Sequence, residues 1–431
     1  MHKVLLVSLG CAKNLVDSEK ILGILKNDEY IITNNLDEAD TIIINTCGFI
    51  ESSKRESLET IFSYINKGKK VIVTGCLVER YKEELEKEIP EVDLFIPIRE
   101  YDSFNEKLQK VDKSLNYKGV IGLNDEYRVL STPSYSAYLL IGDGCDNRCT
   151  YCAIPLIRGP YRSRPLNDIV NEAKKLVSNG VKELIILEQD TTKYGIDLKG
   201  DINIVTLLNE LLKIEGLEYI RLLYLYPDEI SDELIELIGK EKRLTPYFDI
   251  PIQHSESHIL KRMNRRGDKE FLKSLFKKIK DKVPNAILRT TLLVGFPGET
   301  EEDIDNLIEF IKEIKFDHIG TFTYSKEEGT ASYNYKNQID EETKQNRLKR
   351  VMSVARKISY SQNKKHIGEI MEGMVVGYDG SHYLLRSYYN APDDVDGKIY
   401  FKSDIKLNMG QNVKVKITSA YVYDLMGEII K

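Results

Sequence analysis

The sequence predicts an α/β protein in three parts, and three patterns along the chain carry that prediction. Apolar strands alternate with helical stretches over residues 1–130, which predicts an open parallel sheet. Six further strand and helix units with a linker helix fill residues 131–366 and predict a partial (β/α)6 barrel. Short alternating runs with glycine turns over residues 367–431 predict a small β-barrel. A chain of 431 residues can bury the cores of three domains.

The composition indicates a cytoplasmic protein without a membrane span. Hydrophobic residues make up 42% of the chain, yet no apolar run approaches the length that crosses a bilayer. The opening residues 1–7 are too short for a signal peptide and are expected to form the first strand. Cytoplasmic thiols stay reduced, so the six cysteines are not expected to form disulfides. The net charge of −6 argues against a dominant nucleic-acid footprint but allows a local basic face.

The amino-terminal part is expected to gather three cysteines at one edge of its sheet. Each strand ends at a cysteine that has glycine beside it: Cys11, Cys47 and Cys76. Ligands bind beyond the carboxyl ends of parallel strands, so the three thiols should converge. The alternative is three small buried residues, but the repeated pattern favours a three-cysteine iron–sulfur site. The elements expected are Val4–Ser8, Asp17–Lys26, Thr41–Asn45, Ser53–Asn66 and Lys70–Thr74.

A second set of three cysteines, Cys145, Cys149 and Cys152, follows the first strand of the central part. A complete cubane iron–sulfur site needs four thiolates. Three ligands therefore leave one iron open, and an open position on a metal can bind substrate. The alternatives are a zinc knuckle or three buried thiols. A zinc knuckle would need a fourth ligand nearby, and the next histidine is His254.

The central part is read as repeated strand and helix units, with function expected at the carboxyl ends of the strands. Asn167 and Ser231 are expected to cap helices. The strands expected are Ala137–Ile141, Glu183–Leu187, Ile220–Leu225, Tyr247–Ile250, Ile287–Val294 and His318–Tyr324. The helices expected between them are Asn167–Ser178, Asn203–Leu212, Ser231–Gly239, Lys269–Lys280 and Glu301–Glu313.

Two groups of motifs carry a family resemblance. Cys145–Cys152 is spaced Cys-x3-Cys-x2-Cys with Tyr151 before the third cysteine, and it resembles the radical S-adenosylmethionine superfamily. Residues 8–19 (Ser-Leu-Gly-Cys-Ala-Lys-Asn-Leu-Val-Asp-Ser-Glu), together with 45–50 and 74–76, resemble the amino-terminal domain of the methylthiotransferases. Within that family the Gly-Cys-x-Lys-Asn pattern resembles the RimO branch, which modifies a ribosomal protein. The tRNA-modifying MiaB branch usually has Gln-Met-Asn after the first cysteine.

The resemblance implies the cofactors and the reaction. It implies two [4Fe-4S] clusters, held by the two cysteine sets, and S-adenosylmethionine as both methyl donor and radical source. In the RimO branch a methylthio group replaces a hydrogen on the β-carbon of an aspartate in small-subunit ribosomal protein S-twelve, free or in the subunit. A low-potential electron donor such as flavodoxin or ferredoxin and a sulfur source are then further partners. A non-catalytic iron–sulfur redox sensor is a weaker reading, since it needs neither open irons nor a six-unit barrel.

The resemblance also points to residues that contact S-adenosylmethionine. Many superfamily members have Gly-Gly-Glu after the second barrel strand, but this chain has Glu188-Gln189-Asp190, and methylthiotransferases commonly lack the glycines too. Gln189 and Asp190 are the candidate contacts to S-adenosylmethionine. The alternative is that they are only polar residues that lead into the next helix.

Three further residues complete the candidate cofactor-binding set. They are Tyr151 in the cysteine loop, Gln253 after strand four, and Gly295 after strand five, where the superfamily places the adenine. No catalytic residue is assigned, because a lone histidine such as His254 is more often structural than catalytic. The basic loop Ile157–Pro165 is expected either to bind carboxylates of cofactor or substrate or to be solvated.

The carboxyl-terminal part resembles a TRAM domain and helps to choose the substrate. Residues 368–431 hold seven Lys and Arg against nine Asp and Glu. A domain that binds RNA should be clearly basic, so the charge of this one favours a basic protein target. Asp393, Asp394 and Asp396 are expected to contact that target. The runner-up is a tRNA methylthiotransferase acting on a modified adenosine. Its support is the basic linker helix Glu341–Lys365, which is more simply a packed helix with a solvated face.

Overall fold

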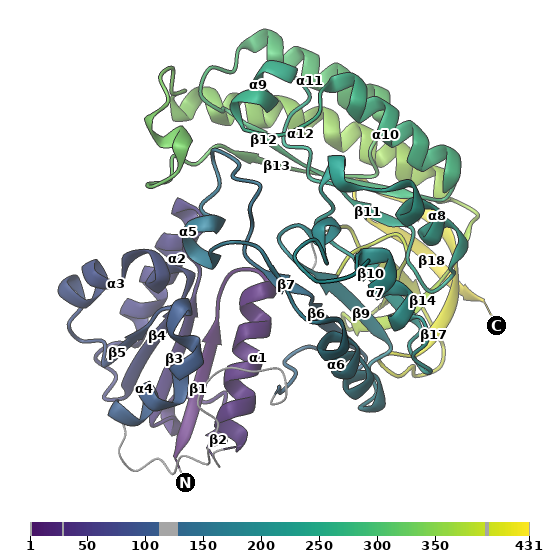
Figure 1. Cartoon of the computed structure of the whole chain (residues 1–431). Helices are drawn as coiled ribbons and strands as arrows, with labels where there is room; N and C mark the ends of the chain where they lie inside the picture. The colour runs from purple at the N-terminus through teal and green to yellow at the C-terminus, as the bar shows by residue number, and fades with distance from the viewer. Residues whose placement is uncertain (1, 28–29, 112–127, 393–395, 431) are drawn as a thin grey trace.

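The computed structural model describes residues 2–27, 30–111, 128–392 and 396–430. Three bodies follow one another along the chain: an open sheet with helices, a split barrel of strand and helix units, and a small closed β-barrel (Figure 1). The predicted α/β fold class is therefore confirmed. Residues 100–130, polar and without clear periodicity, are expected to connect the first two parts, and 112–127 of them lie outside the described residues. Within the described residues, no helix combines the length and apolar character that a membrane span requires.

The amino-terminal sheet is parallel throughout, in the order β2-β1-β3-β4-β5. Its central strand β3 is buried along its whole length, so apolar residues fill both faces. Helices α1 and α4 pack on one face and α2 and α3 on the other. The three predicted strands are confirmed, and the short edge strands β2 and β5 were not predicted. The bounds are β1 Lys3–Ser8, α1 Ala12–Asn27, β2 Ile31–Ile32, β3 Thr41–Thr46, α2 Glu51–Tyr64, β4 Lys70–Gly75, α3 Cys76–Glu88, β5 Leu94–Ile96 and α4 Phe104–Val111.

The central barrel is formed by two three-stranded parallel sheets, ordered β10-β9-β6 and β11-β12-β13. Within the described chain no strand joins β6 to β13, so the barrel is open between these two edge strands. All six predicted strands are present, with ends shifted by at most a few residues. Their bounds are β6 Ser136–Leu140, β9 Glu183–Leu187, β10 Tyr219–Leu222, β11 Tyr247–Asp249, β12 Ile287–Val294 and β13 His318–Thr323.

The barrel helices cover the outer face of the strands and bury one continuous apolar core. Ser231 caps α8 as predicted, by accepting from the backbone N–H of Leu234. The predicted cap at Asn167 is wrong: α6 begins one residue earlier, after Pro165, whose fixed φ starts the helix. The bounds are α6 Leu166–Ser178, α7 Ile204–Leu211, α8 Asp232–Lys240, α9 Ser257–Arg262, α10 Lys269–Lys282 and α11 Glu301–Ile314. Short 3-10 turns cover Leu36–Glu38, Ile98–Ser103, Thr191–Lys193, Pro227–Glu229, Ala331–Asn334 and Lys364–His366.

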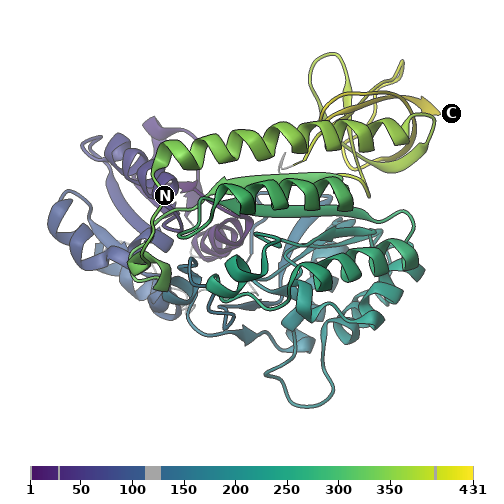
Figure 2. The same ribbon diagram turned by 90° about the horizontal axis from the view of Figure 1, so that it is seen from above.

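Helix α12, Glu341–Asn363, runs beside α11 to the carboxyl-terminal β-barrel (Figure 2). That barrel closes in the order β14-β15-β16-β18-β17. The predicted linker helix and small β-barrel are confirmed, and alternate side chains of β14 and β17 fill the barrel interior. The bounds are β14 Ile370–Tyr378, β15 Tyr383–Ser387, β16 Ile399–Lys402, β17 Asn412–Ala420 and β18 Leu425–Ile430.

The small barrel is anchored at the amino ends of the central strands. Arg386 pairs with Glu183 of β9 at 2.6 Å. Tyr247 of β11 donates to Asp396 at 2.6 Å, and the Asp396 side chain is only 1% exposed. The expectation that Asp396 meets a basic partner at the surface is therefore wrong, because this carboxylate joins two domains. Asp393 and Asp394 lie outside the described residues.

Candidate active site

The three amino-terminal cysteines converge where β1, β3 and β4 end, as the topology predicts. Cys11 follows β1 through Gly10, Cys47 follows β3, and Cys76 begins α3. Gly10 has a φ of +87°, and a Cβ on it would lie 3.0 Å from the Cys47 sulfur. Only glycine allows these loops to approach so closely. Cys47 and Cys76 are buried and Cys11 is exposed, so the set has one accessible side.

Asn14 holds these loops together from the first turn of α1. Its amide nitrogen donates to the carbonyl oxygens of Leu9 (3.1 Å) and Thr46 (2.8 Å). Its amide oxygen accepts from the Cys76 thiol at 3.3 Å. Asn45 then donates to the Asn14 carbonyl at 2.8 Å. One asparagine thus joins the ends of three strands, which is a physical reason for its place after the first cysteine.

Two buried cations cross the boundary between the amino-terminal sheet and the central barrel in opposite directions. Lys13 of α1 donates to the carbonyl of Gly142 (3.0 Å) and lies 2.9 Å from Asp143 in the barrel. Arg158 of α5 (Ile154–Arg158) reaches back, and its Nη1 lies 2.7 Å from Asp17 Oδ2. That ion pair is close but is not aligned as a hydrogen bond. The exchange of cations ties the two cysteine-bearing domains together.

Arg158 also contacts the amino-terminal cysteine set directly. Its Nη2 donates to the Asn14 amide oxygen at 2.9 Å and lies 3.9 Å from the Cys76 sulfur. Burial opposes the charge, but Asp17, Cys76 and Asp143 hold the pKa of Arg158 well above its usual value. Arg158 belongs to the predicted basic loop Ile157–Pro165. Its guanidinium binds partners within the chain.

The second cysteine set lies in a loop that β7 (Gly142–Asp143) and β8 (Arg162–Ser163) close as a short antiparallel pair. Cys145 donates its backbone N–H to the carbonyl of Gly159 at 3.2 Å. The N–H of Ile154 points at the Cys152 sulfur at 3.5 Å. The loop follows β6, so it lies at the carboxyl end of the barrel, where the sequence predicts it.

A buried arginine also contacts this second set. Arg265 Nη1 lies 3.8 Å from the Cys149 sulfur and donates to the Tyr151 hydroxyl at 3.3 Å. Its guanidinium stacks 4.3 Å from the ring centre of Tyr226, whose hydroxyl is 3.6 Å from the same sulfur. Each cysteine set therefore has one sulfur beside a buried guanidinium, which stabilises negative charge on a thiolate ligand.

The donor chemistry of both sets fits iron–sulfur clusters. Burial raises the pKa of Cys76 to about 12 and that of Cys145 to about 11, so these thiols release their protons only when a metal replaces them. Among the described residues, no three His, Cys, Asp or Glu side chains are close enough to hold one metal ion. A cluster instead spreads its cysteine ligands over several irons.

Asp190 and Gln189 lie at the carboxyl end of β9 and are both engaged within the chain. Asp190 accepts from the amide of Asn147, inside the cysteine loop, at 2.6 Å. Gln189 accepts from Lys13 Nζ at 2.7 Å. The neighbouring Glu188 is buried, its oxygens have no hydrogen bond, and burial raises its pKa to about 8.

The remaining candidates lie around the same end of the barrel. Tyr151 packs edge-on against Phe296 with ring centres 6.5 Å apart. Gln253 has a left-handed backbone with a φ of +69°. A Cβ on Gly295 would lie 2.4 Å from the Lys344 side chain, so this glycine makes room for α12. The structure does not test contact of these residues with S-adenosylmethionine.

His254 is fully buried in a network within the protein. Its Nδ1 accepts from the backbone N–H of Glu256 at 3.0 Å, and its Nε2 lies 3.5 Å from Glu299. Glu299 also pairs with Arg347 of α12 at 2.9 Å. These contacts support the structural alternative for His254.

Sequence reasoning did not single out Lys13, Asn14, Arg265 or Tyr226 as site residues. Lys13 and Asn14 entered the sequence analysis only as part of the motif that follows Cys11. Their position directly after that cysteine is the feature of the sequence that could have identified them as site residues. Arg265 and Tyr226 lie in segments without a pattern, and only the folded chain brings them to Cys149.

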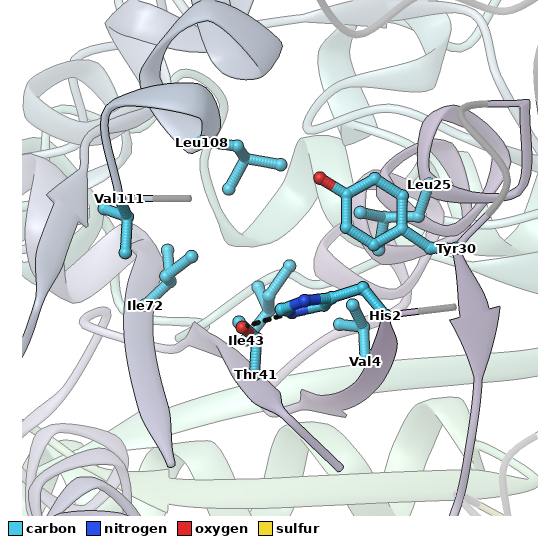
Figure 3. A pocket seen from close by; sticks show the side chains of 9 residues that line it. All are labelled: His2, Val4, Leu25, Tyr30, Thr41, Ile43, Ile72, Leu108 and Val111. Atoms are coloured by element: carbon cyan, nitrogen blue, oxygen red, sulfur yellow. Dashed lines mark hydrogen bonds between the residues drawn. The ribbon is translucent and has the colours of Figure 1, made fainter. Parts of the chain in front are cut away.

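The amino-terminal domain also holds a small apolar pocket at the other end of its sheet (Figure 3). Its volume is about 10 Å³. His2 and Thr41 share a hydrogen bond of 2.8 Å at its rim, where β1 and β3 begin. The pocket therefore lies away from the cysteines and has room for no more than a water molecule.

Three family profiles match the chain in the predicted order. The radical SAM superfamily matches residues 139–311, the uncharacterized protein family UPF0004 matches residues 3–97, and the TRAM domain matches residues 367–430. Among solved structures, the radical S-adenosylmethionine methyltransferase TsrM from Kitasatospora setae is similar with a TM-score of 0.56. It is 14% identical and the match covers 74% of this chain and 73% of that one, which supports the fold alone.

Curated relatives match almost the whole chain. Ribosomal protein uS12 methylthiotransferase RimO from Thermoanaerobacter sp. is 47% identical over 438 residues, covering 99% of this chain and all of the relative. The protein of the same name from Aquifex aeolicus is 47% identical, covering 99% and 96%. The chain thus belongs to the RimO-type methylthiotransferases of the radical S-adenosylmethionine superfamily, enzymes that use S-adenosylmethionine and [4Fe-4S] clusters.

Proposed function

We propose that this enzyme places a methylthio group on the β-carbon of an aspartate in ribosomal protein uS12, the S-twelve protein of the small subunit. The observation that carries the proposal is 47% identity over nearly the full length with relatives named for that substrate. A low-potential electron donor such as flavodoxin or ferredoxin and a sulfur source complete the reaction. Because the substrate is ribosomal, the reaction belongs to the cytoplasm.

The site residues have defined parts in this proposal. Cys145, Cys149 and Cys152 hold one cluster, and Cys11, Cys47 and Cys76 hold the other. When bound, the clusters supply the electron that cleaves S-adenosylmethionine and carry the sulfur that is transferred. Tyr151, Gln189, Asp190, Gln253 and Gly295 remain the proposed S-adenosylmethionine contacts. The proposed domains are residues 1–130, 131–366 and 367–431.

The residues between the two cysteine sets fix their separation. Lys13 and Arg158 each reach from one domain into the other, and both side chains are nearly fully buried. An unactivated C–H bond offers no acid–base route, so the protein contributes positioning and exclusion of water from a reactive radical. The interface between the two domains, where Lys13 and Arg158 form buried ion pairs, suits that task.

The tRNA alternative gains little from α12. Arg347 lies 2.7 Å from Glu301 and 2.9 Å from Glu299, and Arg350 lies 2.5 Å from Glu301. These two arginines are neutralised by carboxylates at the start of α11 and before it, so they contribute little to phosphate binding.

The test is a reconstituted reaction. Full-length protein loaded anaerobically with iron and sulfide is mixed with S-adenosylmethionine, a strong reductant and either uS12 or tRNA, and products are read by mass spectrometry. We expect one methylthio group on one uS12 aspartate and none on tRNA. The Cys47→Ala variant is the matched control, and a methylthiolated tRNA with unmodified uS12 would reverse the assignment.

A further inference from the structure

A cavity of about 570 Å³ lies along the open side of the central barrel. Its walls come from β13 and Arg289 of β12, from α12, and from the segments 396–400 and 423–424 of the small barrel. Strand β13 is the last strand of its sheet, with β12 on one side, and no described strand pairs with its other side (Figure 1). We call this cavity the edge groove.

The backbone of β13 presents unpaired groups to the edge groove. Tyr324 donates its N–H to the Val294 carbonyl of β12 at 2.8 Å. Backbone groups alternate in direction along a strand, so those of Ile319 and Thr321 face away from β12. In the described part of the chain, no other backbone meets them. An edge of this kind is a template for another strand.

Three buried polar atoms from three different elements also lack a hydrogen-bond partner at the edge groove. They are Thr321 Oγ1 of β13, Ser359 Oγ of α12 and Asp396 Oδ1 of the small barrel. Arg289 lies 3.4 Å from Asp396 Oδ1 as an ion pair, without hydrogen-bond geometry. Unsatisfied buried groups cost stability, and three at one cavity indicate that a polar ligand completes them.

The chemistry of the edge groove selects an extended polypeptide. A polypeptide offers alternating N–H and C=O groups that match a free strand edge, and nucleic acid has no such ladder. Burial opposes ionisation of Asp396, but His318 and Arg289 outweigh it and lower its pKa, so the carboxylate only accepts hydrogen bonds. A phosphate cannot donate to it. Phe322 is 55% exposed beside the edge and offers an apolar contact for a side chain.

We propose that an extended segment of the polypeptide substrate binds in the edge groove as an added strand on β13. The identity of that polypeptide as uS12 rests on the proposed function. Strand β13 runs from the edge groove towards the carboxyl end of the barrel, where the cysteine loop after β6 also lies. Just beyond β13, Ser332 donates its N–H to the carbonyl of Thr150 in that loop at 2.9 Å.

The test compares binding of purified uS12 to full-length, cluster-loaded variants. Thr321→Val and Ser359→Ala remove hydroxyls that have no partner in the free protein, so melting temperature should stay level or rise. Affinity for uS12 should fall about fivefold for each hydroxyl, which is the factor for one net hydrogen bond. A purely structural role predicts the reverse pattern, with lower stability and unchanged affinity.

A second variant tests the strand pairing itself. Thr321→Pro removes the N–H at the free edge, a position where edge strands tolerate proline. Its affinity should fall at least tenfold below that of Thr321→Val, which keeps the N–H. Hydrogen exchange should independently show new protection of the Ile319 and Thr321 amides when uS12 is added, while the Gly320 and Phe322 amides, which face β12, stay as they were.

The outcomes separate the two proposals. If the wild-type protein neither binds nor modifies uS12, the proposed function fails. If it modifies uS12 while all three variants bind uS12 like the wild type, the edge groove is not the docking site. Loss of tRNA binding in these variants, with uS12 binding unchanged, would overturn the polypeptide assignment.

Discussion

Replacing Arg158 by methionine should destabilise the protein by about 3–5 kcal/mol, the usual cost of removing one partner from a buried ion pair. Arg158 is 5% exposed and its Nη1 lies 2.7 Å from Asp17. Asp143 keeps Lys13 at 2.9 Å, so Asp17 is the carboxylate left unpaired. Urea unfolding of the metal-free variant measures the loss. A change below about 1 kcal/mol would refute the view that this pair is dry and essential to the interface.

The double variant Arg158→Met/Asp17→Asn separates stability from electrostatics at the cluster. Stability should largely return because no charge is left buried alone. The reduction potential of the amino-terminal cluster should stay more negative than in the wild type, since the guanidinium 3.9 Å from the Cys76 sulfur is gone. The readout is a redox titration followed by electron paramagnetic resonance, with Cys145, Cys149 and Cys152 changed to alanine. Arg128→Met is the matched control, because Arg128 is a buried arginine paired with Glu19 and Glu172. It should lower stability and leave the potential unchanged.

Four further predictions follow from the same site. The loaded protein should contain about eight iron atoms, and about four after Cys145, Cys149 and Cys152 are changed to alanine; iron analysis near four in both would contradict two clusters. Cys47→Ala should still cleave S-adenosylmethionine under strong reductant but yield no methylthio product, and full product would remove sulfur transfer from that set. Arg265→Met should make the potential of the Cys145 cluster more negative in a Cys47→Ala background, and an unchanged titration would contradict the contact with Cys149. Glu188 keeps its proton in the folded protein up to about pH 8 but loses it near its ordinary value of 4.5 when unfolded. Folding stability from this group is therefore greatest below pH 4.5 and declines as pH rises to 8. Glu188→Gln should be more stable than the wild type by about 1–3 kcal/mol at pH 9 and equal to it near pH 4.5. An equal difference at both pH values would count against a buried carboxyl whose pKa burial raises despite Lys13 at 3.7 Å.

Sequence reasoning reached the strands and the cysteine sets because both depend on local pattern. Glu183–Leu187 is buried on both faces and reads as a nearly continuous apolar run, and its bounds match the prediction. Ile287–Val294 also matches to the residue, because apolar residues at both ends frame its polar centre. Parallel topology then brings the ends of β1, β3 and β4 together and the cysteines with them. The edge strands β2 and β5 were missed because two or three residues carry no detectable period.

The contacts between domains could not be read from the sequence. Arg158 stands in a Gly- and Pro-containing basic loop that resembles a solvated or anion-binding segment, and only the folded chain brings Asp17 of α1 to it. The net charge of residues 368–431 includes Asp396 as if it lay at the surface. The structure buries this carboxylate against Tyr247. Charge counts describe a domain in solution and do not tell which carboxylates the neighbouring domain covers.

Mass spectrometry of uS12 and tRNA from cells with and without this gene tests the central claim most directly. The account predicts that uS12 loses a methylthio group on one aspartate when the gene is removed, while the methylthio nucleosides of tRNA stay at their normal level. Unchanged uS12 together with loss of a methylthiolated adenosine from tRNA would contradict it.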